Sequence, residues 1–200
     1  MIEKRLVKQT EEALHLMKEA DKIELFKEEK EYAKKHGLFQ DIEVLEKDSS
    51  TRFADAYIER CEKETEALIL VEAPIFLDQS IEHLKKNRHE FIFVESTSFG
   101  VIGVDAISLE FDDVFETYTA LLGLKIQKKF GPAIKDYFET NLTGDAGKYS
   151  VMFSMADGLW DVNFALSYAD GFKEDMTLAE AFQLIYQFLF TLVEACETFE

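Results

Sequence analysis

Apolar residues recur at steps of three and four near the end of the chain, and this spacing predicts a long C-terminal helix. The stripe consists of Leu178, Phe182, Ile185, Leu189, Leu192, Cys196 and Phe199. The other sides of this helix are also largely apolar, so a single neighbour cannot cover it. We expect it at the centre of the domain or in a subunit interface, where the candidate contacts are Phe182, Ile185, Tyr186, Leu189, Phe190 and Val193. Thr177 and Glu180 form a capping box at its start.

A period of two marks the segment before this helix. Apolar residues alternate with polar ones from Tyr149 to Met155 and again from Trp160 to Leu166. Between the two runs lies Asp157-Gly158, a dipeptide favoured in tight hairpin turns. The pattern predicts a β-hairpin over residues 149–166.

The middle of the chain contains both the helical spacing and the alternating spacing of a strand. Residues 91–95 and 101–109 are rich in β-branched and aromatic residues, which predicts two strands joined around residues 96–100. Acidic residues follow Ser108, and Phe111, Phe115, Tyr118 and Leu122 keep a helical spacing, so we expect a helix over residues 108–122. Pro132 suits the first turn of a further helix that runs to about residue 142.

The first half of the chain is more charged and less regular. Two amphipathic helices are expected, over residues 3–20 and 21–37, and residues 1–47 could form a peripheral helical arm. A third helix is expected from Asp48 to about Ile69. Residues 67–95 allow two interpretations: a β-α-β unit with strands at 67–71 and 91–95, or a helical pair that leads into a sheet. The pattern slightly favours the helical pair.

This order of elements indicates an α+β fold. We expect a mainly antiparallel sheet that includes the 149–166 hairpin, packed by helices, with the long apolar helix at the end and a charged helical region at the start. A length of 200 residues fits a single domain, 1–200, with its main core in residues 88–200.

Charge and cysteine content limit the partners and the cellular compartment that we expect. A net charge of −18 opposes binding to phosphate backbones and anionic membranes, so neither a nucleic acid nor a membrane is an expected partner. No apolar signal segment follows Met1, and the uncharged run at 181–193 is shorter than the roughly 20 residues of a spanning helix. Cys61 and Cys196 suit reduced, buried thiols. We therefore expect a soluble cytoplasmic protein.

Few residues suggest chemistry. Asp112, Asp113 and Glu116 are weak candidates for a metal site, although acidic residues in a first helical turn need no metal. Trp160 and His89 could line a small pocket. The glycines at 100 and 103 match neither phosphate-binding pattern, and the sequence has no catalytic motif that we recognise. We expect no cofactor.

These observations favour a non-enzymatic cytosolic protein that acts in protein interaction or regulation as a homodimer. A chaperone-like role, in which a sheet face holds another chain, fits the same features. The alternative is an enzyme that binds a small molecule or a metal in an acidic pocket between the 108–122 helix and the 149–166 hairpin.

Overall fold

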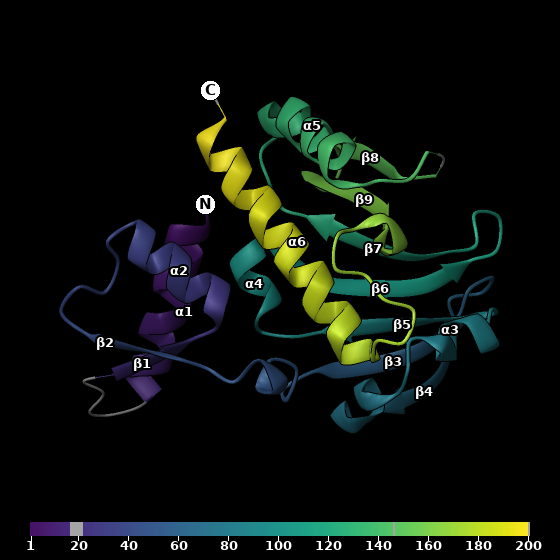
Figure 1. Cartoon of the computed structure of the whole chain (residues 1–200), viewed down its shortest axis with the longest axis horizontal. Helices are drawn as coiled ribbons and strands as arrows, with labels where there is room; N and C mark the ends of the chain where they lie inside the picture. Colours follow the sequence, from purple (N-terminus) through teal and green to yellow (C-terminus); the bar gives the residue numbers. More distant parts are fainter. Residues whose placement is uncertain (17–21, 146, 200) are drawn as a thin grey trace.

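The chain folds as an α+β protein, and the computed structural model describes residues 1–16, 22–145 and 147–199 (Figure 1). The helices are α1 Ile2–Leu16, α2 Lys27–Lys35, α3 Glu82–Lys86, α4 Phe99–Ile102, α5 Gly131–Asn141 and α6 Leu178–Thr198. Short 3₁₀ turns are η1 Ser49–Thr51, η2 Pro74–Asp78, η3 Lys128–Phe130 and η4 Leu166–Tyr168. The strands are β1 Lys22–Leu25, β2 Glu43–Glu46, β3 Tyr57–Glu62, β4 Leu68–Glu72, β5 Glu90–Glu95, β6 Val104–Asp112, β7 Thr117–Leu124, β8 Tyr149–Ser154 and β9 Leu159–Ala165.

Seven strands form one antiparallel sheet in the order β4-β3-β5-β6-β7-β9-β8. The 149–166 hairpin is confirmed: β8 and β9 pair with Val151 opposite Val162, and Gly158 adopts a φ of 71° in the turn. Residues on one face are fully buried, such as Ile92 and Ile107. The opposite face stays partly open to solvent, because antiparallel sheets can be covered on one side only.

Helix α6 runs diagonally across the buried face of the sheet (Figure 1). Its predicted start is confirmed: Thr177 N–H donates to Glu180 Oε2 at 2.7 Å, and Glu180 N–H donates to Thr177 Oγ1 at 3.1 Å. Helix α6 is long and apolar enough to cross a bilayer, but most of it is buried within the chain, as in the core helix of a soluble protein.

The residues named as interface candidates on α6 are core residues in this structure. Each is at most 3% exposed in the isolated chain: Phe182, Ile185, Tyr186, Leu189, Phe190 and Val193. Of the two positions expected for this helix, the structure places it at the centre of the domain. No surface is left at these six side chains for a second molecule to cover.

The helix expected over residues 108–122 is wrong. Strand β6 continues to Asp112, a tight turn follows, and β7 begins at Thr117. Phe111 and Tyr118, which share a helical spacing in the sequence, face each other across the two strands, with ring centroids 5.1 Å apart. The acidic residues occupy the turn, and Glu116 has a positive φ of 52°.

Residues 48–95 also differ from the favoured interpretation. The predicted helix from Asp48 to Ile69 is instead the short turn η1, strand β3 and part of strand β4. The alternative, with strands near 67–71 and 91–95 around helical turns, is correct in its elements. However, β4 and β5 are not neighbours, because β3 lies between them and pairs antiparallel with both.

The N-terminal part contains two helices and a small parallel sheet of β1 and β2. The second helix begins at Lys27 rather than residue 21, because residues 22–25 form β1. Helix α1 packs against α4, and Leu6 and Tyr32 join the same apolar core as the large sheet. The predicted end of the first helix near Ala20 lies outside the described residues.

A fully buried arginine connects α2, η1 and α6. Arg52 Nη2 lies 2.7 Å from Glu28 Oε1, and its Nη1 lies 3.2 Å from Glu29 Oε1. The guanidinium is stacked between two aromatic rings, 3.8 Å from the centroid of Phe26 and 3.9 Å from that of Tyr186. Burial raises the pKa of Tyr186 well above its usual value, so its hydroxyl stays protonated and donates to Glu29 at 2.7 Å. This network fixes the N-terminal part to the central helix.

Candidate functional site

The acidic residues proposed as metal ligands form a turn. Asp112 Oδ1 accepts hydrogen bonds from the backbone N–H groups of Val114 at 2.7 Å and Phe115 at 2.9 Å. Asp113 pairs with Arg88 at 2.9 Å instead of facing Asp112 and Glu116. Within the described ranges, no group of three or more His, Cys, Asp or Glu side chains could hold a metal ion. Turn formation explains the aspartates at these positions.

Trp160 and His89 are not brought together with these acids. Trp160 is 6% exposed, packs on Phe153 with ring centroids 5.0 Å apart, and lies opposite Leu124. Because Leu124 ends β7 and the acidic turn precedes its first residue, the two groups lie at opposite ends of that strand. His89 directly precedes β5, and its side chain is 66% exposed. The acidic pocket expected between a 108–122 helix and the hairpin therefore does not form from these residues.

One of the predicted residues does line a small pocket. A cavity of about 350 Å³ lies beside the β6–β7 turn and includes Glu116. Its other lining residues are Lys85, Phe111, Phe115, Thr117, Tyr118, Ser167, Tyr168, Phe172, Lys173 and Glu174. Asp112, Asp113, Trp160 and His89 are not among them, so the pocket is not the site that the sequence suggested.

The cysteines lack the environment of an activated thiol. Both are buried and free. Burial raises the pKa of Cys196 to about 11, and burial also raises the pKa of Cys61. Since the thiolate is the reactive form, neither side chain is activated as a nucleophile near neutral pH.

The most unusual surface in the structure is the edge strand β4. Four consecutive apolar side chains are exposed there: Leu68 at 54%, Ile69 at 43%, Leu70 at 50% and Val71 at 47%. Ile75 and Tyr57 nearby are 75% and 43% exposed. These six are half of the twelve large apolar side chains that are exposed in the described part of the chain. An apolar cluster of this kind is typical of an interaction surface.

The backbone of β4 is as open as its side chains. Among the described strands, β4 pairs only with β3, so its outer edge presents N–H and C=O groups that an added strand could bind. Natural edge strands are commonly protected by lysine, proline or a bulge. Strand β4 itself contains no lysine or proline. It does contain a bulge towards the hairpin, where Ile69 is an extra residue between Leu68 and Leu70, and Leu70–Glu72 keep regular pairing.

Arg60 contacts the C-terminal end of β4. Its guanidinium binds both carboxylate oxygens of Glu90, at 2.9 Å and 2.7 Å, and reaches Glu72 of β4 at 3.3 Å. Hydrogen bonding to Glu90 is the main reason that the pKa of Arg60 is raised. Because this contact anchors the last residue of β4, the exposed strand is held in place before any partner binds.

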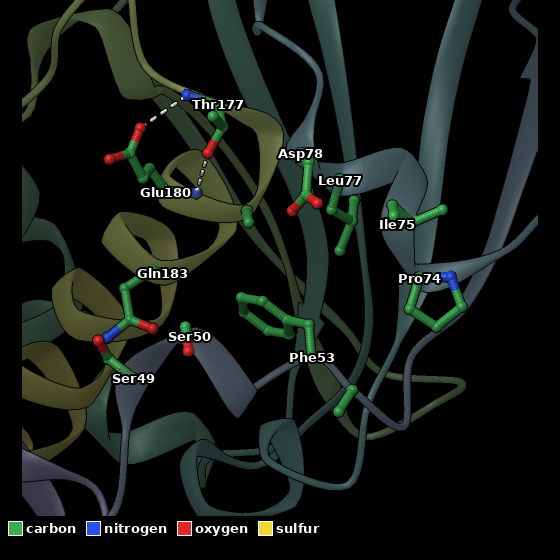
Figure 2. A pocket seen from close by; sticks show the side chains of 12 residues that line it. Ser49, Ser50, Phe53, Pro74, Ile75, Leu77, Asp78, Thr177, Glu180 and Gln183 are labelled. Carbon is green, nitrogen blue, oxygen red and sulfur yellow. Dashed lines mark hydrogen bonds between the residues drawn. The ribbon is translucent and has the colours of Figure 1, made fainter.

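A pocket of about 510 Å³ adjoins the end of β4, between η1, η2 and the first turn of α6 (Figure 2). Its apolar lining includes Pro74, Ile75 and Phe53, and Ser49, Ser50 and Gln183 add polar groups. Figure 2 shows Glu180 on the α6 side, in the capping box, and Asp78 on the opposite side. No basic residue lines this cavity.

Two sequence signals point to this region without identifying it. The apolar run at 67–71 is a strand in one of the two interpretations, and Pro74, which suits the first turn of a helix, follows this run. Neither signal shows that the strand lies at a sheet edge, since strand order depends on pairing between distant segments. The chain has no significant match among family models, curated proteins or solved structures.

Proposed function

We propose that the protein is a non-enzymatic interaction module of the cytoplasm that binds an extended segment of another protein along β4. The observation that carries the proposal is the exposure of Leu68–Val71 on a preformed sheet edge. An added strand would hydrogen-bond to the open backbone and cover side chains on both faces of the sheet. A chaperone-like or regulatory role is consistent with such binding. The two buried, free cysteines support a reducing compartment.

The enzymatic alternative has less support. Its residues are separated: Trp160 lies in the core, His89 is on the surface, and the acids form a turn. A homodimer stays a prediction, which native mass spectrometry of the whole chain tests directly.

Hydrogen exchange tests the proposed strand addition. The probe is a soluble peptide with the core Val-Thr-Val-Ile-Val and serine ends, added to the isotopically labelled protein. We expect outward-facing amides of β4 to exchange more slowly, whereas amides of the other edge strand, β8, keep their rates.

Two matched variants sharpen this test. Val71→Lys places a charge on the β4 edge, and Met152→Lys places one on β8, where Met152 is 66% exposed. We expect only Val71→Lys to abolish the protection. The proposal fails if the peptide protects no β4 amide at millimolar concentration, or if both variants bind it as the wild type does.

A further inference from the structure

We infer that the segment bound along β4 is an apolar run of four or five residues with lysine or arginine at both ends. The inference rests on the proposed function and adds the chemistry of the partner. It follows from the distribution of charge and apolar area along the edge.

The middle of the edge selects apolar residues. Paired residues share a face of the sheet, so Leu70, opposite Arg60, lies on one face. Leu68 and Val71, opposite Cys61 and Glu59, lie on the other face, and Ile69 is the extra residue of the bulge. All four are about half exposed. A strand placed beside β4 therefore meets apolar side chains on both of its faces, and a continuous apolar run fits better than an alternating one.

The hairpin that precedes β4 is acidic. Glu62 is the last residue of β3, and Glu64 and Glu66 lie exposed in the β3–β4 connection. The lysine within it, Lys63, donates to the backbone carbonyl of Phe111 and is thus directed towards β6. This end of the edge presents carboxylates to the end of an added strand.

The opposite end is acidic as well. Just past β4, the acidic residues Asp78 and Glu180 line the 510 Å³ pocket, and no basic residue is in its lining. The Glu180 carboxylate also accepts the hydrogen bond from Thr177 N–H at 2.7 Å. Arg60 is shared between Glu72 and Glu90, so one positive charge faces two carboxylates, and this group does not make the end of the edge positive. A lysine or arginine that follows the apolar run would face these carboxylates.

The same charge distribution disfavours a second copy of this chain as the occupant. Two β4 strands paired antiparallel about a two-fold axis would bring the acidic hairpin of each copy to the acidic pocket end of the other. Each copy also carries a net charge of −18. Like charges in these positions oppose pairing, whereas a strand with basic ends is attracted.

Three peptides test the inference by calorimetric titration against the whole protein. They share the apolar core Val-Ile-Val-Ile-Val and end in Lys-Lys, Ser-Ser or Glu-Glu on both sides. At low salt we expect the basic peptide to bind at least about tenfold tighter than the acidic one, with the difference shrinking in about 0.5 M NaCl as charges are screened.

Two double variants that remove the same number of charges distinguish the effect of carboxylates beside β4 from the effect of the net charge of the protein. Glu64→Gln with Glu66→Gln removes two carboxylates beside β4. Glu11→Gln with Glu12→Gln removes two from the exposed side of α1, where both side chains are exposed. We expect the first pair to weaken the basic peptide several-fold and the second pair to leave its affinity nearly unchanged.

The outcomes separate the inference from the proposed function. Equal binding of the three peptides, or equal effects of the two variant pairs, overturns the basic-ended partner while strand addition stands. If none of the peptides binds, the proposed function fails and the inference with it. A dimer in native mass spectrometry that Val71→Lys dissociates would assign the edge to a second copy and overturn the inference.

Discussion

Replacing Arg52 with methionine should severely destabilise the protein. The Arg52 side chain is fully buried, and methionine keeps much of its apolar stem while it removes the charge. Glu28 and Glu29, with side chains 16% and 7% exposed, then lose their cationic partner. Because α2 and α6 meet at this network, the loss acts on the attachment of the N-terminal part to the core.

The size of the effect follows from the burial of the charges. Removing one partner of a buried ion pair costs about 3–5 kcal/mol, because the other charge stays without compensation. For a chain of this length, each kcal/mol lowers Tm by about 2–4 °C, so we expect Tm to fall by about 6–20 °C.

The pH dependence has a definite sign. Burial raises the pKa of Glu28, and the Arg52 guanidinium opposes this rise. In the variant the folded-state pKa rises further, so Glu28 binds its proton more tightly in the folded than in the unfolded state. The stability that comes from this tighter proton binding is present at low pH. It is lost as the pH rises from the pKa of Glu28 in the unfolded chain to its higher pKa in the folded variant. The variant should therefore lose more stability at pH 8 than at pH 5.

Urea titration and thermal melting, followed by circular dichroism at both pH values, measure these changes. Lys86→Met is the control, since it breaks an exposed pair with Glu82 at 2.8 Å and should cost less than about 0.5 kcal/mol. If Arg52→Met stays within about 1 kcal/mol of the wild type at pH 8, or loses more stability at pH 5, the reasoning about the network is wrong.

Three further predictions concern packing, acid stability and thiol reactivity. A Cβ at Gly131 would meet Trp160 at 2.6 Å, so Gly131→Ala should cost about 1–3 kcal/mol in urea titration, whereas the Cβ of Gly100→Ala meets nothing within 4 Å and should not destabilise. Burial alone would raise the pKa of Glu90, but hydrogen bonds to the Arg60 guanidinium lower it below the ordinary value of 4.5. Glu90→Gln should therefore be less stable than the wild type at pH 7. This difference in the free energy of unfolding should disappear as the pH falls through the lowered pKa of Glu90 in the folded protein. Cys196 should react with a thiol reagent at pH 7 only as fast as the protein unfolds; rapid reaction of the folded protein would contradict its burial.

Elements with a complete local signal could be predicted from the sequence. The Asp157-Gly158 turn between two alternating runs, Pro132 in a first helical turn and the Thr177/Glu180 capping box each have a short-range cause. The structure has the hairpin, α5 and α6 at these places. The α+β class followed from the same elements.

The 108–122 segment shows where local reasoning fails. Phe111, Tyr118 and Leu122 are spaced as on a helix, but they also fit two strands joined by a turn, in which alternate residues are buried. The choice between the two depends on distant partners: β7 pairs with β9, where Thr119 lies opposite Ala165. Nothing within residues 108–122 contains that information.

Strand β3 was misinterpreted for a different physical reason. Its pairing with β5 is regular, so Ile58 and Cys61, three positions apart, lie on opposite faces of the strand, and both are buried. This spacing is the same as one turn of a helix. A strand with buried residues on both faces therefore imitated a helical stripe in the sequence.

The candidate site could not be predicted because an apolar strand is ordinary until its neighbours are known. Leu68–Val71 would be a normal buried strand in the middle of the sheet, whereas at the edge about half of each side chain stays in water. Covering the exposed halves of four such side chains would contribute about 3–6 kcal/mol. Association itself costs at least about 4 kcal/mol, and ordering a flexible segment costs more. Apolar burial alone therefore gives weak binding, so backbone hydrogen bonds and charges at the strand ends must supply the rest. For the same reason, a partner segment already held extended in its own protein should bind more tightly than a free peptide of the same sequence.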